Sequence, residues 1–198
     1  MDSDQVPRGV WWSIVAALCL LVAGGVILAV ALANGFNATR PSAPPDWTLE
    51  APLLLEVQPG QIATHTLIDP GPAFTMEVLA EPHNDVTLNG YGIIYHAPSA
   101  TQYEIFAIGA DGYYTILQVV NGAERPRVAW QQFPHIRRGQ QTNRLRVTCT
   151  QQACCFFIND EYVTALDAQD PGGAVGLWVR GFDAPAQVQF EHVSVWYD

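Results

Sequence analysis

The chain has 198 residues, a length that fits one domain with a small appendage. It is acidic, with a net charge of -10 and an isoelectric point near 4.7, and only 14% of its residues are charged. A nucleic-acid-binding protein needs a basic face to neutralise phosphates. The composition therefore argues against nucleic acid as a partner.

An uncharged apolar stretch lies close to the N-terminus, at residues 10–33, after a short tail at residues 1–9. As a helix it would measure about 36 Å, which exceeds the roughly 30 Å hydrocarbon core of a bilayer. A buried core helix would show a polar face, and this stretch has none. A cleaved signal peptide remains an alternative, because Ala31-Leu32-Ala33 has the small-x-small form of a cleavage site.

The length of the stretch exceeds the h-region of about 7–15 residues found in signal peptides. We therefore expect a retained transmembrane helix at 10–33 that acts as a signal anchor. This interpretation predicts a single-pass protein of the cell membrane. Its partner would be the lipid bilayer, and its C-terminal domain would be extracytoplasmic.

Residues 34–46 contain three prolines and two asparagines and are typical of a short linker. The remainder, residues 47–198, alternates short runs of β-branched and aromatic residues with Gly, Pro, Asn and Asp, which predicts an all-β sandwich or barrel. The expected strands are Leu53–Val57, Ala63–Leu67, Ala73–Ala80, Tyr91–His96, Tyr103–Ile108, Tyr113–Val119, Arg127–Gln131, Arg144–Thr150, Ala153–Ile158, Tyr162–Ala165, Ala174–Arg180 and Gln187–Trp196. A one-residue slip in the alternation of the last strand indicates a β-bulge.

A hairpin is predicted around Gln151 and Gln152, where a two-residue turn would place Cys149 directly opposite Cys154. Opposed cysteines on one face of a hairpin could form a cross-strand disulfide. Alternatively, both are small buried core residues. No metal site is predicted, because no histidine lies between His135 and His192 at ligand spacing from these cysteines.

The order of several motifs resembles the concanavalin A-like lectin/glucanase superfamily, and most of all its laminin-G-like and keto-disaccharide-hydrolase-like domains. The motifs that carry the resemblance are Gly92–His96, Tyr103–Ile108, Asp111–Leu117, Asn143–Val147, Phe156–Asp160, Gly173–Leu177 and Val188–Val195. The resemblance covers roughly residues 47–198 and implies an antiparallel jelly-roll β-sandwich with one concave sheet. The chain departs from the family at Asp160, where a glycine usually follows the asparagine.

The superfamily contains lectins, glycosidases and adhesion modules, so the fold alone does not define an activity. Retaining glycosidases need two carboxylates about 5–5.5 Å apart. In this fold the two usually come from a Glu-x-Asp-x-x-Glu or Glu-x-Asp-x-Glu segment, and the chain has neither. We therefore expect no enzyme activity and no cofactor. A structural calcium ion bound by loop residues among Asp69, Asp111, Asp167 and Asp170 stays open, although turn chemistry also explains these residues.

Two binding surfaces are predicted, each with a simpler alternative. Aromatic rings flanked by hydrogen-bonding groups suit carbohydrate, although such rings also fill sandwich cores. The expected ligand-binding residues are Tyr95, His96, Tyr103, Tyr114, Trp130, Trp178 and Arg180. A cluster of arginines would bind an anionic partner, or else form a solvated or salt-bridged face. Its members are Arg125, Arg127, Arg137, Arg138, Arg144 and Arg146.

These observations predict a membrane-anchored, extracytoplasmic, non-catalytic module that binds carbohydrate or another cell-envelope component. An accessory subunit of a larger membrane complex is the alternative, with other subunits as partners. A glycoside-hydrolase-like enzyme is third.

Overall fold

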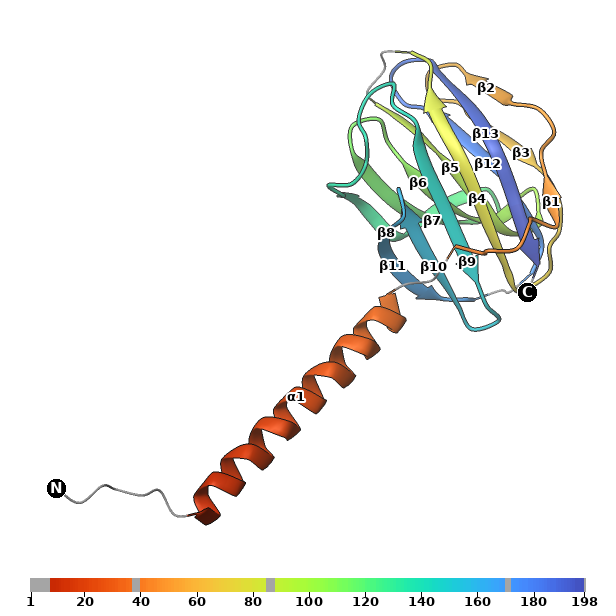
Figure 1. Cartoon of the computed structure of the whole chain (residues 1–198). Coiled ribbons are helices and arrows are strands. Elements are labelled where there is room, and N and C mark those ends of the chain that lie inside the picture. The colour runs from red at the N-terminus through yellow and green to blue at the C-terminus, as the bar shows by residue number, and fades with distance from the viewer. Residues whose placement is uncertain (1–7, 37–39, 85–87, 170–171, 198) are drawn as a thin grey trace. The chain divides into compact units, whose positions relative to one another are not determined.

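The computed structural model describes residues 8–36, 40–84, 88–169 and 172–197, with the side chains of the N-terminal helix described at 11–26. The chain divides into two compact units, Met1–Thr39 and Arg40–Asp198. The first contains the helix α1, Arg8–Phe36, and the second contains the strands (Figure 1).

Within the part of the chain that the structure describes, no helix combines the length and the apolarity needed to cross a membrane. This finding contradicts the predicted location as a single-pass protein of the cell membrane.

The described residues of the second unit form thirteen strands, all paired antiparallel. They are β1 Trp47–Thr48, β2 Leu53–Val57, β3 Ile62–Thr66, β4 Phe74–Pro82, β5 Asn89–Ser99, β6 Gln102–Ile108, β7 Tyr113–Val120, β8 Ala123–Gln132, β9 Asn143–Cys149, β10 Ala153–Ile158, β11 Glu161–Asp167, β12 Ala174–Gly181 and β13 Ala186–Tyr197. The predicted all-β sandwich is therefore confirmed, and β1 is an element that the sequence did not predict.

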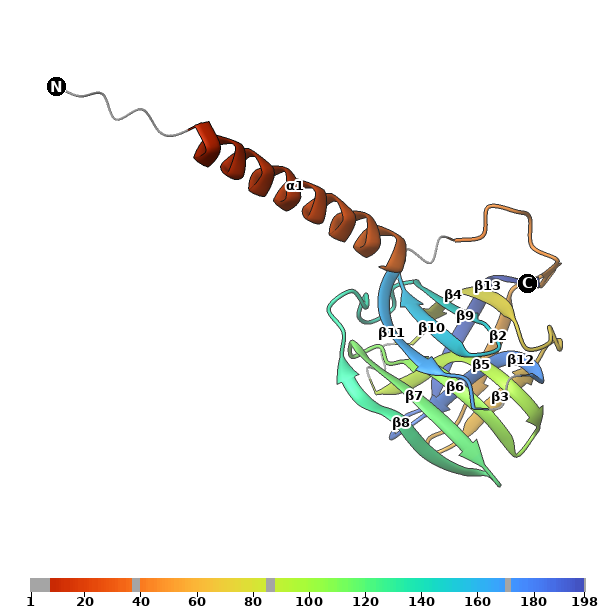
Figure 2. The same ribbon diagram turned by 90° about the horizontal axis from the view of Figure 1, so that it is seen from below.

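The strands form two sheets that pack face to face (Figures 1 and 2). Within the described residues, one is a seven-stranded sheet in the order β1-β13-β4-β9-β10-β11, with β2 also paired to β13, and the other is a six-stranded sheet in the order β3-β12-β5-β6-β7-β8. The main core lies between them and includes Phe74, Tyr91, Phe106, Phe156 and Phe190, all fully buried. Alternation along each strand places these side chains on the inner faces.

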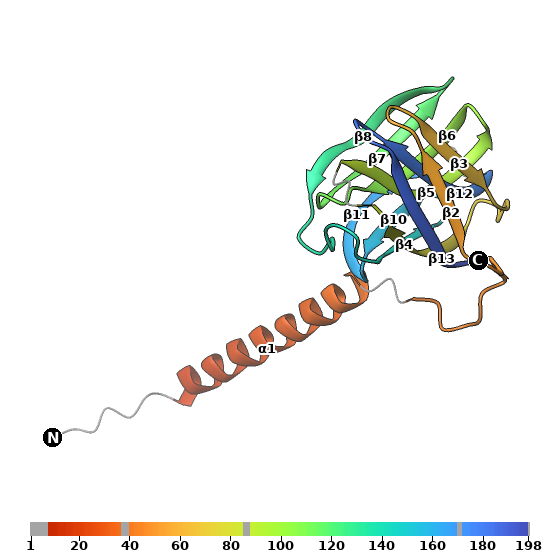
Figure 3. The same ribbon diagram turned by 90° about the horizontal axis from the view of Figure 1, so that it is seen from above.

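The six-stranded sheet also buries its outer face. A second apolar cluster lies there, opposite in alternation to the core residues, and consists of Ile94, Ile105, Ala107, Leu117, Val119 and Trp178. We call this surface the concave face, because the sheet bends around it: Arg180 Nη1 of β12 lies 2.5 Å from Glu124 Oε2 of β8, although β5, β6 and β7 separate these two strands in the sheet. Figure 3 shows β8 at the curved rim of this sheet.

Two predicted local features are present. The pairing of β13 with β4 changes register between Glu191 and Ser194, which confirms the predicted bulge. Cys149 and Cys154 face each other across the β9–β10 hairpin, and their Sγ atoms form a disulfide. The Thr150 amide donates to the Ala153 carbonyl in the adjacent pair, which places the cysteines at a position where opposed Cα atoms approach most closely.

Candidate functional site

An open pocket of about 380 Å³ lies at one end of the six-stranded sheet. We call it the end pocket. Its lining comes from the start of β5, the β6–β7 turn, the distal part of β8 and the loop after β12, which are far apart in sequence but meet at one edge of the sandwich. The lining residues are Leu88, Asn89, Asp111, Tyr113, Trp130, Phe182 and Asp183.

Three aromatic rings form the apolar part of the end pocket. Tyr113 and Trp130 are 39% and 37% exposed, so their ring surfaces are available to a ligand. The Trp130 ring packs edge-on against Phe182, with ring centroids 6.1 Å apart, and this contact fixes its orientation. The exposed faces can therefore stack on an apolar ligand surface without rearranging the pocket.

Glycine at position 90 allows Trp178 to pack against β5, with Trp130 in van der Waals range beside it. A Cβ at Gly90 would lie 2.8 Å from Cζ3 of Trp178 and 3.6 Å from Cη2 of Trp130. Two large rings on the concave face thus pack directly on the β5 backbone. The end pocket therefore continues the concave face past Trp178, where the apolar cluster on that face ends.

The polar part of the end pocket consists of two carboxylates and one amide. The Asp111 carboxylate accepts a hydrogen bond from the Tyr113 amide at 3.2 Å, which holds it in the β6–β7 turn. The side-chain Oδ1 of Asn89 accepts a hydrogen bond from the Ala110 amide at 3.1 Å, and Asn89 is buried. Both side chains are fixed by backbone hydrogen bonds, so the pocket presents preorganised polar groups beside its aromatic rings.

The structure separates the predicted ligand-binding residues. Tyr95, His96 and Tyr114 are buried within the sandwich, Trp178 is fully buried on the concave face, and Trp130 alone among the seven lines the end pocket. The remaining two, Tyr103 and Arg180, also lie on the concave face, where Arg180 pairs with Glu124. Sequence reasoning considered Asp111 only as a calcium ligand and missed the other pocket residues, because loop sequences carry no signal of which loops meet.

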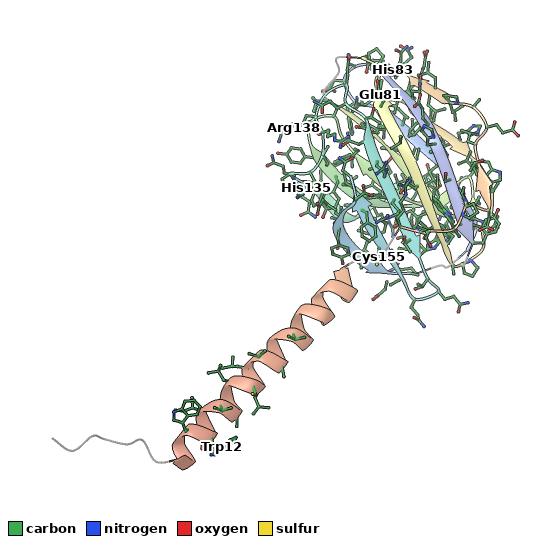
Figure 4. The ribbon with its side chains drawn as sticks, in the orientation of Figure 1. Trp12, Glu81, His83, His135, Arg138 and Cys155 are labelled. Carbon is green, nitrogen blue, oxygen red and sulfur yellow. A yellow bond between two sulfur atoms is a disulfide. The ribbon has the colours of Figure 1, made fainter. Side chains whose placement is uncertain are left out.

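The predicted arginine cluster is dispersed over two sheets and one loop. Arg127 binds Glu104, Arg144 binds Asp160 at 2.8 Å, and the Arg146 guanidinium stacks over the Phe157 ring at 4.3 Å. Arg137 Nη1 donates to the Thr142 carbonyl, and Figure 4 places Arg138 and His135 in the β8–β9 connection. Arg125 is exposed on β8.

The acidic residues considered for calcium have structural contacts of their own. Asp69 accepts a hydrogen bond from the Gly71 amide, and Asp111 caps the turn described above. The Asp167 carbonyl accepts from Arg127. Asp170 lies outside the described residues.

A second group of chemistry-bearing side chains lies inside the sandwich. His96 Nε2 is 3.9 Å from Cys154 Sγ, and the ligand atoms of His96, Cys149 and Cys154 all lie within 4.8 Å of one another. Among the described residues, this is the group of three that could hold a metal ion. His96 lies more than fifty positions before Cys149 in the sequence, so no ligand-spacing motif could have linked this histidine to the two cysteines.

Glu104 and Arg127 complete this interior group. His96 Nδ1 lies 3.6 Å from Glu104 Oε2, and Arg127 Nη1 donates to Glu104 Oε1 at 2.8 Å. Burial raises the pKa of the Glu104 carboxyl, but the contact with His96 and the charge of Arg127 together outweigh burial, so this pKa lies below its ordinary value. Glu104 is therefore a buried, ionised carboxylate beside the imidazole.

The sequence matches no protein-family model and no curated protein. Solved structures are similar in fold. The carbohydrate binding module CBM66 from Bacillus subtilis is 16% identical with a TM-score of 0.53, over 67% of this chain and 76% of that module. A functionally unknown protein from Saccharomyces cerevisiae is 16% identical with a TM-score of 0.56, over 78% of this chain and 93% of that protein.

The GH43 protein BlXynB from Bacillus licheniformis is also similar, at 13% identity and a TM-score of 0.55, over 73% of this chain and 33% of that protein. At these identities the similarity shows the fold alone. That fold is the two-sheet β-sandwich, which this chain shares with CBM66 and with part of BlXynB.

Proposed function

We propose that this chain is a non-catalytic carbohydrate-binding module and that the end pocket is its sugar-binding site. The observation that carries the proposal is the pairing of exposed, oriented aromatic rings with fixed hydrogen-bonding groups in one open pocket. Sugars present C–H faces that stack on rings and hydroxyls that need donors and acceptors. The similarity to a carbohydrate binding module supports the same proposal.

The charge of the end pocket favours a neutral sugar. Both charged residues in its lining, Asp111 and Asp183, carry carboxylates. Carboxylates accept hydrogen bonds from sugar hydroxyls, whereas they repel the acidic groups of uronic or sialic acids. We therefore propose a neutral glycan as the ligand class.

Binding without catalysis follows from the role of the pocket acids. Of the two carboxylates in the pocket, Asp111 accepts a hydrogen bond within its own turn, and the chain has no Glu-x-Asp-x-Glu segment of the kind that supplies the paired acids of retaining glycosidases in this fold. The pocket is open, so a short stretch of glycan can enter it from solvent.

A glycan array probed with the full chain tests this proposal. We expect binding to neutral glycans and weaker or no binding to acidic ones. Trp130→Ala should weaken binding at least tenfold, because it removes a stacking face, which corresponds to about 1.4 kcal/mol or more. Tyr162→Ala is the matched control, since Tyr162 is also 37% exposed but lies on β11 outside the pocket.

Two results would contradict the proposal. One is an array on which the folded protein binds no glycan. The other is equal loss of binding in Trp130→Ala and Tyr162→Ala, because that would remove the end pocket from the interaction.

A further inference from the structure

We propose that the dithiol form of this protein binds one Zn²⁺ ion through Cys149, Cys154 and His96, so that the interior disulfide is a redox-controlled metal site. The site lies between the two sheets and is independent of the end pocket. It goes beyond carbohydrate recognition, because zinc occupancy would depend on whether Cys149 and Cys154 are reduced or oxidised.

The donor set fits zinc. Two thiolates and one imidazole are common zinc ligands, and three protein ligands are the number used where a fourth position stays exchangeable. His96 Nε2 already faces Cys154 Sγ at 3.9 Å, and all three ligand atoms lie within 4.8 Å. Since Zn–S and Zn–N bonds are about 2.3 Å and 2.0 Å long, a shared ion needs ligand atoms roughly 3.5–4 Å apart.

The surroundings of His96 match those of a metal-binding histidine. Such a histidine usually directs its second ring nitrogen at a carboxylate, which fixes the tautomer and orients the ring. Here His96 Nδ1 lies 3.6 Å from the Glu104 carboxylate, slightly beyond hydrogen-bond distance, and Arg127 holds that carboxylate from the other side. Nε2 is thereby left to face the two sulfur atoms.

The backbone at His96 gives independent support. His96 has φ 48, a left-handed conformation that costs a non-glycine residue free energy. The β5–β6 pairing also changes register between Tyr95 and Ser99. Alternation would place Tyr95 and His96 on opposite faces, but both are buried against Phe74 or Phe156 in the interior. The strained residue is the one that turns the imidazole toward the disulfide.

Charge balance selects Zn²⁺ over a monovalent ion. Two thiolates, a neutral imidazole and Zn²⁺ sum to zero, and the Glu104–Arg127 pair beside them also sums to zero. A buried site with no net charge avoids the penalty of an uncompensated charge in the interior. His96, Cys149 and Cys154 are each no more than 2% exposed, so this penalty applies here.

The redox step uses an external dithiol as the reductant. Two electrons from the dithiol break the Cys149–Cys154 bond, and the dithiol becomes a disulfide. Its two protons pass to the Cys149 and Cys154 sulfur atoms. Zn²⁺ then displaces both protons to solvent as it binds the thiolates.

Equilibrium dialysis of the full chain against Zn²⁺ tests the proposal. The experiment uses a Cys19→Ser/Cys155→Ser background, which removes the two free cysteines and leaves the site intact. Figure 4 labels Cys155, which neighbours Cys154 but points to the opposite face of β10. The protein is reduced with a dithiol in urea and refolded with or without Zn²⁺, so that burial does not prevent reduction.

We expect one Zn²⁺ per chain in the reduced protein and none in the oxidised protein. His96→Ala should weaken binding by more than tenfold, and Glu104→Gln by about 10–100-fold, as for other carboxylates behind a ligating histidine. Cobalt substitution should give thiolate-to-metal charge-transfer absorption that requires both cysteines. Each variant is checked for its β-sheet circular dichroism spectrum in the oxidised state, and His135→Ala is the control for loss of a histidine elsewhere.

The proposal is overturned by a reduced, refolded protein that retains no Zn²⁺. It is equally overturned if His96→Ala binds Zn²⁺ as tightly as the parent, or if the reduced chain fails to regain its β-sheet spectrum with Zn²⁺ present. None of these results affects glycan binding, so failure here is distinguishable from failure of the proposed function.

Discussion

Asn143 shows how a single buried amide can connect three segments of the sandwich. Its Nδ2 donates to the Tyr91 hydroxyl and to the carbonyls of Arg137 and Gln141, and its Oδ1 accepts from the Arg137 amide. The side chain of Asn159 donates to the same oxygen at 2.8 Å. Asn143 is fully buried, so its side-chain amide depends on these partners within the protein.

Replacing this amide should be costly. We expect Asn143→Ala to lower the free energy of unfolding by about 3 kcal/mol, because the buried Tyr91 hydroxyl and the backbone groups of Arg137 and Gln141 lose their partner at once. Urea titration followed by tryptophan fluorescence measures the change. Gln151→Ala, at an exposed position of the β9–β10 turn, should change it by less than about 0.5 kcal/mol. Equal effects of the two substitutions would show that the hydrogen-bond network contributes no stability.

At the scale of elements, alternation and turn residues predicted most strands to within a few positions. The predicted strand at Tyr91–His96 extends to Ser99 in the structure, and β8 begins earlier than predicted, at Ala123. Both differences occur where a register shift interrupts the pairing. A bulge adds a residue without changing residue type, so alternation alone cannot locate it unless the slip is visible, as it is in β13.

The β10–β11 hairpin turn illustrates backbone control of an element. Asn159 and Asp160 have φ 52 and φ 70, as a type I′ turn requires at both central positions. The Asn159 side chain also accepts from the Arg144 amide at 2.9 Å and donates to the His135 carbonyl. Conformation and side-chain bonding thus both favour asparagine.

Two substitutions separate these contributions. Asn159→Gly keeps the left-handed conformation and loses only the side-chain bonds, whereas Asn159→Ala loses both. We expect Asn159→Ala to be less stable than Asn159→Gly by about 1 kcal/mol, since alanine in this conformation is strained. Thermal and urea unfolding of both variants measure the difference. An alanine variant as stable as the glycine variant would argue against a strained turn in the folded protein.

At the scale of the whole molecule, burial of both faces of the six-stranded sheet explains why the aromatic candidates were hard to rank from sequence. Six consecutive positions of β5, Tyr91–His96, are all buried, and so are five consecutive positions of β12. A strand buried on both faces reads as a continuous apolar run, so its rings cannot be assigned to core or surface. Trp130 differs because β8 is mostly exposed.

The same packing encloses tyrosine hydroxyls. Tyr91 and Tyr95 are fully buried between the sheets. Burial, with a smaller contribution from Asp111, raises the pKa of Tyr91 above its ordinary value of 10.0, although the hydrogen bond with Asn143 opposes this shift. Burial and the negative charge of Glu104 raise the pKa of Tyr95 in the same direction.

These shifts predict alkaline destabilisation with a defined sign. Above about pH 10 the unfolded chain releases phenolic protons that the folded sandwich retains, so the unfolded state binds fewer protons and stability falls as pH rises. The slope should approach about 1.4 kcal/mol per pH unit for each such tyrosine. Below about pH 10 both states keep these phenolic protons, so Tyr91 and Tyr95 should contribute no pH dependence to the free energy of unfolding. Urea unfolding at a series of pH values from about 8 to 12 measures the slope.

Tyr91→Phe should reduce that slope by about 1.4 kcal/mol per pH unit, the contribution of one titrating group. Phenylalanine fills the same space and has no phenolic proton to release. Tyr197→Phe is the matched control, since Tyr197 is 47% exposed at the end of β13 and gains nothing from burial. An unchanged slope in Tyr91→Phe would mean that water reaches the phenol in the folded state. That result would contradict a dry interface between the two sheets, on which the buried positions of Tyr95, His96 and the disulfide also depend.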